Sequence, residues 1–507
     1  MAGATMQWTS LPDEGGSEMN LGAISRRDVL IGAVIIVMAA VVGAAAAVGG
    51  KIAILGVAAL LAVAVGVYIG LRHPLWLYWG MAIAIGALPF GYFPGVHVPL
   101  YLPFAAGALL AAWVHPTATK RWPTLAKAVL ILVIVSGIAM VCTYTSIVNV
   151  MDYTKWAIAT SAFFALLALP AEHLAKFGRI FVYAATFNAA FGIASVAIGS
   201  NQMLLQPFRL FGYAVANTER FYFTGGVSNL PRTDRFAVGA GSQSFTRLGG
   251  LWLDPNAAGI GLVIAFVIAM ILLVGWQRAV AVTILGLAIA LTLSRSAIVT
   301  TLVGVALVFL FHKMRSRDRQ LLVGALIVAF TTAMLVPSVR TRLLGTLGSN
   351  DAGATDRMDS IREFPGRMSG HWLFGWGWSQ REFKDGAYAF IQNFVSNAPL
   401  IAIHRAGIFV GIAFIAVVII GCVIGFRLLR ANSLPRALYG GVFIGFSVVA
   451  LNLDHPVVVI PQIVFLYTIF LTFLAYADEL RQTAQVVETA PAAARIPAAA
   501  VPARAPG

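Results

Sequence analysis

The feature that most constrains this sequence is a series of apolar stretches, many of them about 20 residues long, separated by short charged connectors. Hydrophobic residues make up 59% of the chain and charged residues only 11%, whereas soluble domains carry about 25% charged residues. These values exclude a soluble enzyme, a disordered protein and a fibrous protein. A transmembrane barrel is excluded too, because its strands alternate between apolar and polar residues.

The sequence therefore predicts an all-α fold, a polytopic transmembrane helix bundle with about 12 to 14 spans. A large extracytoplasmic loop is expected before the last three spans. The predicted segments are a cytoplasmic N-terminal segment (1–27), N-terminal spans (28–199), a first outer loop (200–254), central spans (255–336), a large outer loop (337–396), C-terminal spans (397–477) and a disordered Ala/Pro-rich cytoplasmic tail (478–507).

The charge distribution supplies a topology. The net charge is +15, from 35 Lys and Arg against 20 Asp and Glu. Short cytoplasmic loops of membrane proteins collect Lys and Arg, and the strongest basic clusters, near 120–127, 313–319 and 427–436, fall on one side if the N-terminus is inside. Both termini are then expected in the cytoplasm, and nucleic acid is not an expected partner. The two cysteines, Cys142 and Cys422, lie in apolar runs and form neither a disulfide framework nor a zinc motif.

Arginines dominate the basic residues of the two outer loops, among them Arg247 and Arg357. Because the guanidinium fork binds phosphate bidentately, these arginines indicate a phosphorylated substrate. Pairing with the acidic residues of the second loop is the alternative. Arg295 lies at the membrane edge between two apolar runs, where an arginine is costly unless it is paired, lines a polar cavity or snorkels to the interface.

Two further motifs lie at the outer level. In LWLDPNAAGIG, Pro255 is expected to open a helix that Asp254 caps, with Asn256 beside it as a candidate substrate contact. The segment FGWGW places Trp376 and Trp378 next to a tight turn. These indoles are either a sugar-stacking platform or an interfacial anchor.

A general base is harder to find from the sequence. His371, His404 and Asp454 are the candidates on the outer side, although a single histidine is more often structural than catalytic. The sequence contains no metal-binding or nucleotide-binding motif, so no metal ion and no cofactor are expected.

Together, these motifs resemble the O-antigen ligase and O-antigen polymerase superfamily of bacterial envelope proteins. LWLDPNAAG is similar to the family's aromatic-x-x-Pro-Asn-x-x-Gly entry to a span, and LTLSRSA to its Ser-Arg-Ser/Gly element. DRMDSIREF followed by HWLFGWGWSQREF resembles the family's loop arginine and its Phe-Gly-x-Gly pattern. The resemblance covers roughly residues 249–475, with the large outer loop before three last spans.

The resemblance implies that Arg295 and Arg357 hold a lipid-linked pyrophosphate. The family's His-Asn-x-x-Leu motif, seven residues before a glycine, aligns with Ser396, Asn397, Leu400 and Gly407. Ser396 thus stands where the family has its catalytic histidine. Either His404, His371 or Asp454 supplies the base, or the usual chemistry has been lost.

The expected function is that of a membrane glycosyltransferase in polysaccharide biosynthesis of the cell envelope. It would transfer or polymerise glycan from a polyprenyl (undecaprenyl) pyrophosphate carrier at the outer face of the bacterial inner membrane. The acceptor is a glycan, a lipid or a protein, and the choice between ligase and polymerase stays open. The alternatives are a transporter or flippase of an anionic lipid or polysaccharide, for which inverted repeats would be expected, and a non-catalytic glycan-assembly protein.

Overall fold

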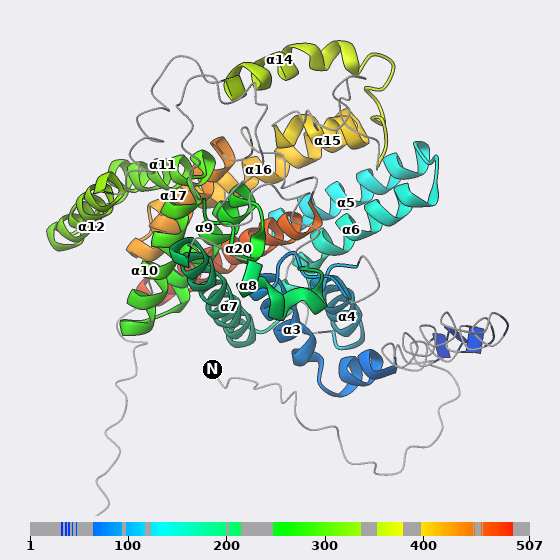
Figure 1. Ribbon diagram of the computed structural model, residues 1–507, viewed down its shortest axis with the longest axis horizontal. Coiled ribbons are helices and arrows are strands. Elements are labelled where there is room, and N and C mark those ends of the chain that lie inside the picture. The colour runs from blue at the N-terminus through cyan, green and yellow to red at the C-terminus, as the bar shows by residue number, and fades with distance from the viewer. Residues whose placement is uncertain are drawn as a thin grey trace, which may run out of the picture.

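The computed structural model describes residues 64–93, 98–116, 123–198, 202–213, 247–335, 352–378, 397–449 and 460–489, with single positions between 32 and 47 and at 451 and 458. Regular structure in these ranges is helical, and their β pairing is limited to one isolated bridge between Tyr92 and Pro99. The predicted all-α class is therefore confirmed (Figure 1).

The helices follow one another along the chain with short connections. They are α3 (Pro74–Ala87), α4 (Tyr101–Val114), α5 (Thr124–Cys142), α6 (Ile147–Leu167), α7 (Ala171–Ile198), α8 (Gln202–Leu205), η1 (Gln206–Phe211), η3 (Gly250–Trp252), α9 (Pro255–Leu272), α10 (Gly275–Thr292), α11 (Arg295–Phe311), α12 (Ser316–Leu335), α14 (Ala352–Arg367), α15 (Ala398–Ala406), α16 (Ile408–Leu429), α17 (Leu434–Val448) and α20 (Pro461–Thr489).

Six of the described helices are long and apolar enough to cross a membrane: α5, α7, α9, α10, α16 and α20. Four shorter apolar helices, α3, α4, α11 and α17, accompany them. The chain is thus a multi-pass helical membrane protein. The higher count of about 12 to 14 spans and the side that each loop faces stay predictions, and the first two predicted spans lie largely outside the described residues.

Local sequence explains how α9 begins. Pro255 occupies the first turn, and the Asp254 carboxylate accepts hydrogen bonds from the backbone N–H of Asn256 at 3.2 Å and of Ala257 at 3.0 Å. These bonds satisfy two of the donors that a helix leaves open at its N-terminus. The predicted capping role of Asp254 is confirmed.

Small residues let neighbouring helices approach closely. At the crossing of α11 and α17, a Cβ atom added to Gly304 would lie 2.7 Å from the Cα atom of Val442, and one added to Gly441 would overlap the Gly304 carbonyl oxygen. Transmembrane helices associate through van der Waals packing, which such contacts maximise. Aromatic side chains fill the space beside this crossing, with Phe443 and Phe470 at 5.0 Å between ring centroids.

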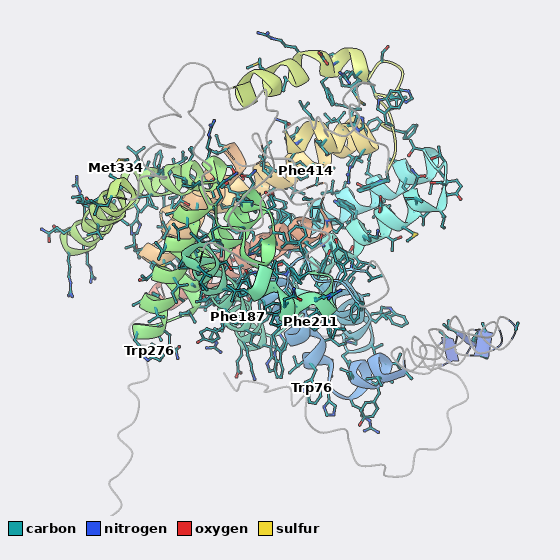
Figure 2. All side chains as sticks on the ribbon, in the orientation of Figure 1. Trp76, Phe187, Phe211, Trp276, Met334 and Phe414 are labelled. Carbon is teal, nitrogen blue, oxygen red and sulfur yellow. The ribbon has the colours of Figure 1, made fainter. Side chains whose placement is uncertain are left out.

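Two exposed tryptophans mark one edge of the bundle. Trp76 at the start of α3 and Trp276 at the start of α10 lie along the lower edge in Figure 2, whereas Phe414 lies among the packed helices. Indoles concentrate at membrane interfaces. The N-terminal ends of α3 and α10 therefore share one edge of the bundle, which the charge pattern predicts to be the cytoplasmic side.

The other end of the bundle is called the site end below. It consists of the α5–α6 connection, the α15–α16 junction and the N-terminal turns of α6 and α20, and α14 lies outside the packed helices beside α15 and α16 (Figure 1). At the opposite end, α20 continues to Thr489, so residues 478–489 of the predicted disordered tail (478–507) are helical. There Arg481 pairs with Asp478 at 2.8 Å. Ion pairs between residues three positions apart stabilise a helix.

Candidate functional site

A polar cavity of about 290 Å³ lies at the site end. Segments far apart in the sequence contribute its polar side chains, namely Tyr92, Asp152, Lys155, Trp156, Arg405 and Gln462. Gln462 on α20 donates to the Tyr92 hydroxyl at 3.3 Å, which ties the last helix to the segment before α4. The cavity therefore depends on tertiary contacts between the two halves of the chain.

The charges of this cavity come from α6 and α15. Lys155 Nζ lies 3.1 Å from Asp152 Oδ1, one turn earlier on α6, and both side chains are partly exposed. Arg405, in the last turn of α15, donates from Nη1 to the Val458 carbonyl at 3.2 Å. Among the described residues, the cavity thus has two cations and one carboxylate, so its lining favours a ligand that carries negative charge.

Trp378 contacts the Arg405 side chain. The Arg405 guanidinium carbon lies 5.5 Å from the centroid of the Trp378 ring, within the range of a cation–π contact. The Trp378 indole in turn packs on Trp156 at 5.2 Å between centroids, and the Trp378 carbonyl accepts a hydrogen bond from the Asn149 amide. Asn149 also closes the capping box of α6 with Ser146. The α5–α6 hairpin therefore orients Arg405 through this indole.

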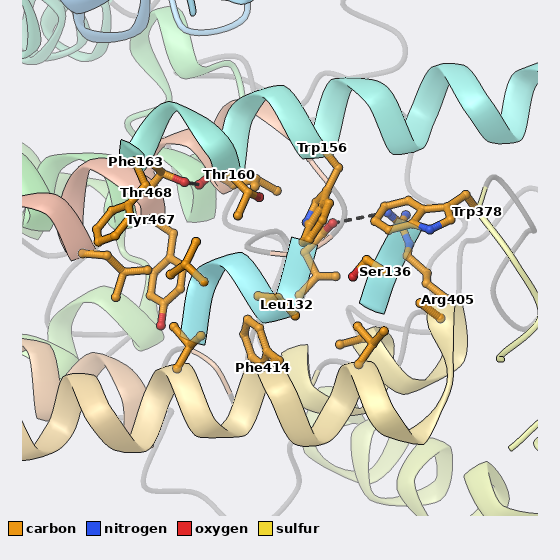
Figure 3. Close-up of a pocket in the computed structure, with 18 residues that line it drawn as sticks. Leu132, Ser136, Trp156, Thr160, Phe163, Trp378, Arg405, Phe414, Tyr467 and Thr468 are labelled. Atoms are coloured by element: carbon orange, nitrogen blue, oxygen red, sulfur yellow. Dashed lines mark hydrogen bonds between the residues drawn. The ribbon is translucent and has the colours of Figure 1, made fainter. Parts of the chain in front are cut away.

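A second cavity, the slot, continues from the polar cavity between α5, α6, α16 and α20 (Figure 3). Trp156, Arg405, Val458 and Val464 line both cavities. The slot measures about 30 Å³, roughly the volume of one water molecule, and most of its walls are apolar side chains.

Four polar atoms in the slot have no hydrogen-bond partner among the described residues. They are Ser136 Oγ, Thr160 Oγ1, Trp378 Nε1 and Tyr467 OH, each from a different element. A buried donor without a partner costs about 1 to 3 kcal/mol.

The structure places Arg247 and Asn256 together at the N-terminal end of α9. Arg247 donates from Nε to the Thr292 carbonyl and from Nη2 to the Asn256 amide oxygen, both at 3.0 Å. These bonds connect the chain before η3 with the start of α9 and the end of α10.

Burial raises the pKa of the neighbouring Asp254 carboxyl. The backbone N–H groups that donate to this carboxylate, and the charge of Arg247, act in the opposite direction. Arg295 is half-buried at the start of α11. None of these residues lines the polar cavity.

The predicted histidines do not line the polar cavity either. The His371 ring stacks on Trp376 with 3.6 Å between centroids, and Trp376 Nε1 donates to the Arg367 carbonyl at 3.1 Å. The His404 side chain is buried, with 3% exposure. Both histidines therefore lie near the α15–α16 junction and outside the polar cavity.

The remaining predicted residues have separate positions. Asn397 is the N-cap of α15, where its side chain accepts from the Leu400 N–H at 3.0 Å. Arg357 belongs to α14, and its side chain lies outside the described residues, as does Asp454. Of the predicted indoles, Trp378 lines the slot and Trp376 is exposed.

Asp152 and Lys155 are site residues that the sequence analysis missed. Their signal was available, since MDYTKW places a carboxylate, an amine and two aromatic rings within two helical turns between apolar runs. Charged residues in such a position are functional candidates by default. Arg405 is a third site residue that the sequence analysis missed, because nothing in its local sequence indicates the Trp378 contact.

No protein-family model matches the chain, and no curated protein matches it either. Among the described residues there is no group of three or more His, Cys, Asp and Glu side chains able to hold a metal ion. The function is therefore argued from the side chains of the site.

The stability of the protein should depend on pH through His404. Burial, with smaller effects of Arg405 and His371, lowers the pKa of His404 from 6.5 to about 4. Between these values the unfolded chain binds a proton that the folded protein does not, so stability is complete above about pH 6.5 and falls as the pH drops towards 4.

We expect the melting temperature of His404→Gln to fall less than that of the wild type over this range, measured in detergent at matched salt. His371→Gln, whose ring is partly exposed, is the control. Parallel melting curves for wild type and His404→Gln would contradict a neutral, buried His404.

Proposed function

We propose that the protein is a membrane glycosyltransferase that transfers glycan from a polyprenyl-pyrophosphate carrier to an acceptor hydroxyl at the outer face of the bacterial inner membrane. The observation that carries this proposal is the meeting of Asp152, Lys155 and Arg405 in one polar cavity. The cavity lies at the site end, which the charge pattern assigns to the outside. The motif resemblance to the O-antigen ligase and polymerase superfamily supports the same reaction.

The two cations are suited to a pyrophosphate leaving group. When the bond to the sugar breaks, negative charge develops on the phosphate oxygen, and fixed cations that face this charge lower the barrier. In this proposal Arg405 provides a planar fork oriented by Trp378, and Lys155 provides a point charge. Arg247 instead holds the ends of α9 and α10 together.

Asp152 is the proposed general base. The acceptor oxygen forms a bond with the anomeric carbon of the donor sugar, its proton passes to the Asp152 carboxylate, and the bond from that carbon to the phosphate oxygen breaks. The electron pair of the broken bond stays on the pyrophosphate, which remains attached to the carrier. Asp152 would then act as the general base. In the family that the motifs resemble, a histidine has this role, and Ser396 stands at the corresponding position.

Ligand binding tests the first half of the proposal. The purified protein in lipid nanodiscs is titrated with undecaprenyl pyrophosphate and with undecaprenol, which has the same chain without the phosphates, and bound lipid is counted by native mass spectrometry. We expect the pyrophosphate to bind and undecaprenol not to compete. Equal binding of both lipids would remove the basis for an anion site.

A deletion strain tests the reaction itself. Without a transferase, carrier-linked glycan should accumulate at the outer face of the inner membrane, where an added glycosidase can digest it in spheroplasts. Accumulation at the inner face, protected from the glycosidase, would indicate the flippase alternative. Normal levels of carrier-linked glycan would overturn both functions.

A further inference from the structure

The turn of residues 371–378, called the indole turn here, is held firmly to the α15–α16 junction. Backbone hydrogen bonds run from Ile408 N to the Trp372 carbonyl at 2.8 Å and from Trp376 N to the His404 carbonyl at 2.7 Å. A third bond, from Gly375 N to the His371 carbonyl at 2.9 Å, closes the turn. Whatever the indole turn contacts is therefore coupled mechanically to the start of α16.

The outer side of the indole turn is apolar and aromatic. Leu373 is 59% exposed, and Trp372, Phe374 and Trp376 are each about 40% exposed. Exposed apolar residues in such a compact group indicate an interaction surface. The inner side of the same turn is different, because Trp378 is buried and lines the slot together with Arg405.

This surface is continuous with the membrane-facing side of α16. Phe409 follows directly after Ile408, which bonds the Trp372 carbonyl, and Ile412 lies about one helical turn later; they are 53% and 57% exposed. The exposed positions continue along one face of α16, a helix long and apolar enough to cross the membrane, at Ile415, Ile419 and Val423. The exposed face of such a helix contacts lipid chains, so the aromatic group lies where that lipid-contacting stripe ends.

We propose that the indole turn is an interfacial anchor, with Trp372, Leu373, Phe374 and Trp376 inserted among the lipid head groups and upper chains of the bilayer. Indoles suit this layer because one part of the ring is apolar and its N–H is polar. The occupant of the surface is therefore lipid, and neither a sugar chain nor a protein partner.

The anchor has a consequence for the site. Since Trp376 faces lipid and Trp378 supports Arg405 only two residues later, the indole turn holds the polar cavity close to the head-group level. This inference does not rest on the proposed reaction. Any substrate with a polar group attached to a membrane lipid would meet the cavity at this depth.

Depth-dependent fluorescence quenching tests the anchor. Cys142 and Cys422 are replaced by alanine, and a single cysteine is introduced by Leu373→Cys, Ile412→Cys or Ser316→Cys. Each variant is labelled with an environment-sensitive dye in nanodiscs of phosphatidylethanolamine and phosphatidylglycerol. Ile412 on the exposed face of α16 is the lipid control, and the exposed Ser316 beside basic residues at the start of α12 is the aqueous control.

We expect spin-labelled lipid with a shallow quencher to reduce the emission at position 373 several-fold more than at position 316, and iodide to do the reverse. Position 412 should respond to the lipid quencher and not to iodide. If the dye at 373 behaves like that at 316, the indole turn faces water and the anchor is wrong.

The Trp372→Ser and Trp376→Ser double variant adds a second readout, because it should raise iodide quenching at position 373. Unchanged iodide quenching would also overturn the proposal.

Discussion

Arg405→Ala should reduce glycan transfer by about 100-fold to 1,000-fold while folded protein stays near normal, because it removes a cation that faces the leaving pyrophosphate. The side chain is partly buried between the two cavities, so its charge acts with less solvent screening than a surface charge would. Its side chain donates to the Val458 carbonyl and contacts the Trp378 ring.

A second substitution at position 405 separates the effect of the positive charge from that of the guanidinium geometry. Arg405→Lys keeps the charge and loses the planar fork, so partial activity is expected, well below that of the wild type. Lys155→Ala should cause a smaller loss, because Lys155 is already paired with Asp152. The matched control is Arg319→Ala, which removes an exposed arginine of α12 outside the cavity.

Transfer from carrier-linked glycan should be measured in membranes with matched amounts of each variant, together with undecaprenyl pyrophosphate binding. Wild-type turnover in Arg405→Ala would exclude this residue from the anion site. Loss of activity with unchanged carrier binding would place Arg405 on the acceptor side instead.

Gly407→Ala should be among the most destabilising single substitutions at the site end. Gly407 has a φ of +84°, and a Cβ atom at this position would overlap the Leu373 carbonyl oxygen. The neighbour is backbone of the indole turn and cannot rotate away. We expect a loss of about 3 kcal/mol or more, from the left-handed backbone together with forced separation of the turn from the α15–α16 junction.

Gly370→Ala is the matched control for the backbone effect. Gly370 has a φ of +79° and no atom within 4 Å of an added Cβ, so its substitution should cost only about 1 kcal/mol. Melting temperatures in detergent and the yield of monodisperse protein are the measurements. Similar losses for both variants would mean that the contact between Gly407 and Leu373 adds nothing, and that the indole turn is held more loosely than its hydrogen bonds imply.

The start of α9 follows from local sequence. Pro255 and Asp254 begin that helix as predicted, because a fixed proline φ and a capping carboxylate act within three residues. Asn397 is an N-cap for the same kind of reason. The roles assigned through the family resemblance to Arg295, Arg357 and Asp454 stay predictions.

The sequence by itself determined that this chain is helical and multi-pass in the membrane, because long apolar runs can satisfy their backbone groups in lipid only as helices. Tertiary structure alone decided which polar groups meet. Asp152 and Lys155 come from α6, Arg405 from α15 and Gln462 from α20, and their cavity exists only because α6 and α20 pack together beside α15. Hydrophobic periodicity predicts where helices run, but it contains no information about which helix lies beside which. That choice rests on close contacts such as Gly407 against Leu373 and Arg405 over Trp378, between residues far apart in the chain or in different elements.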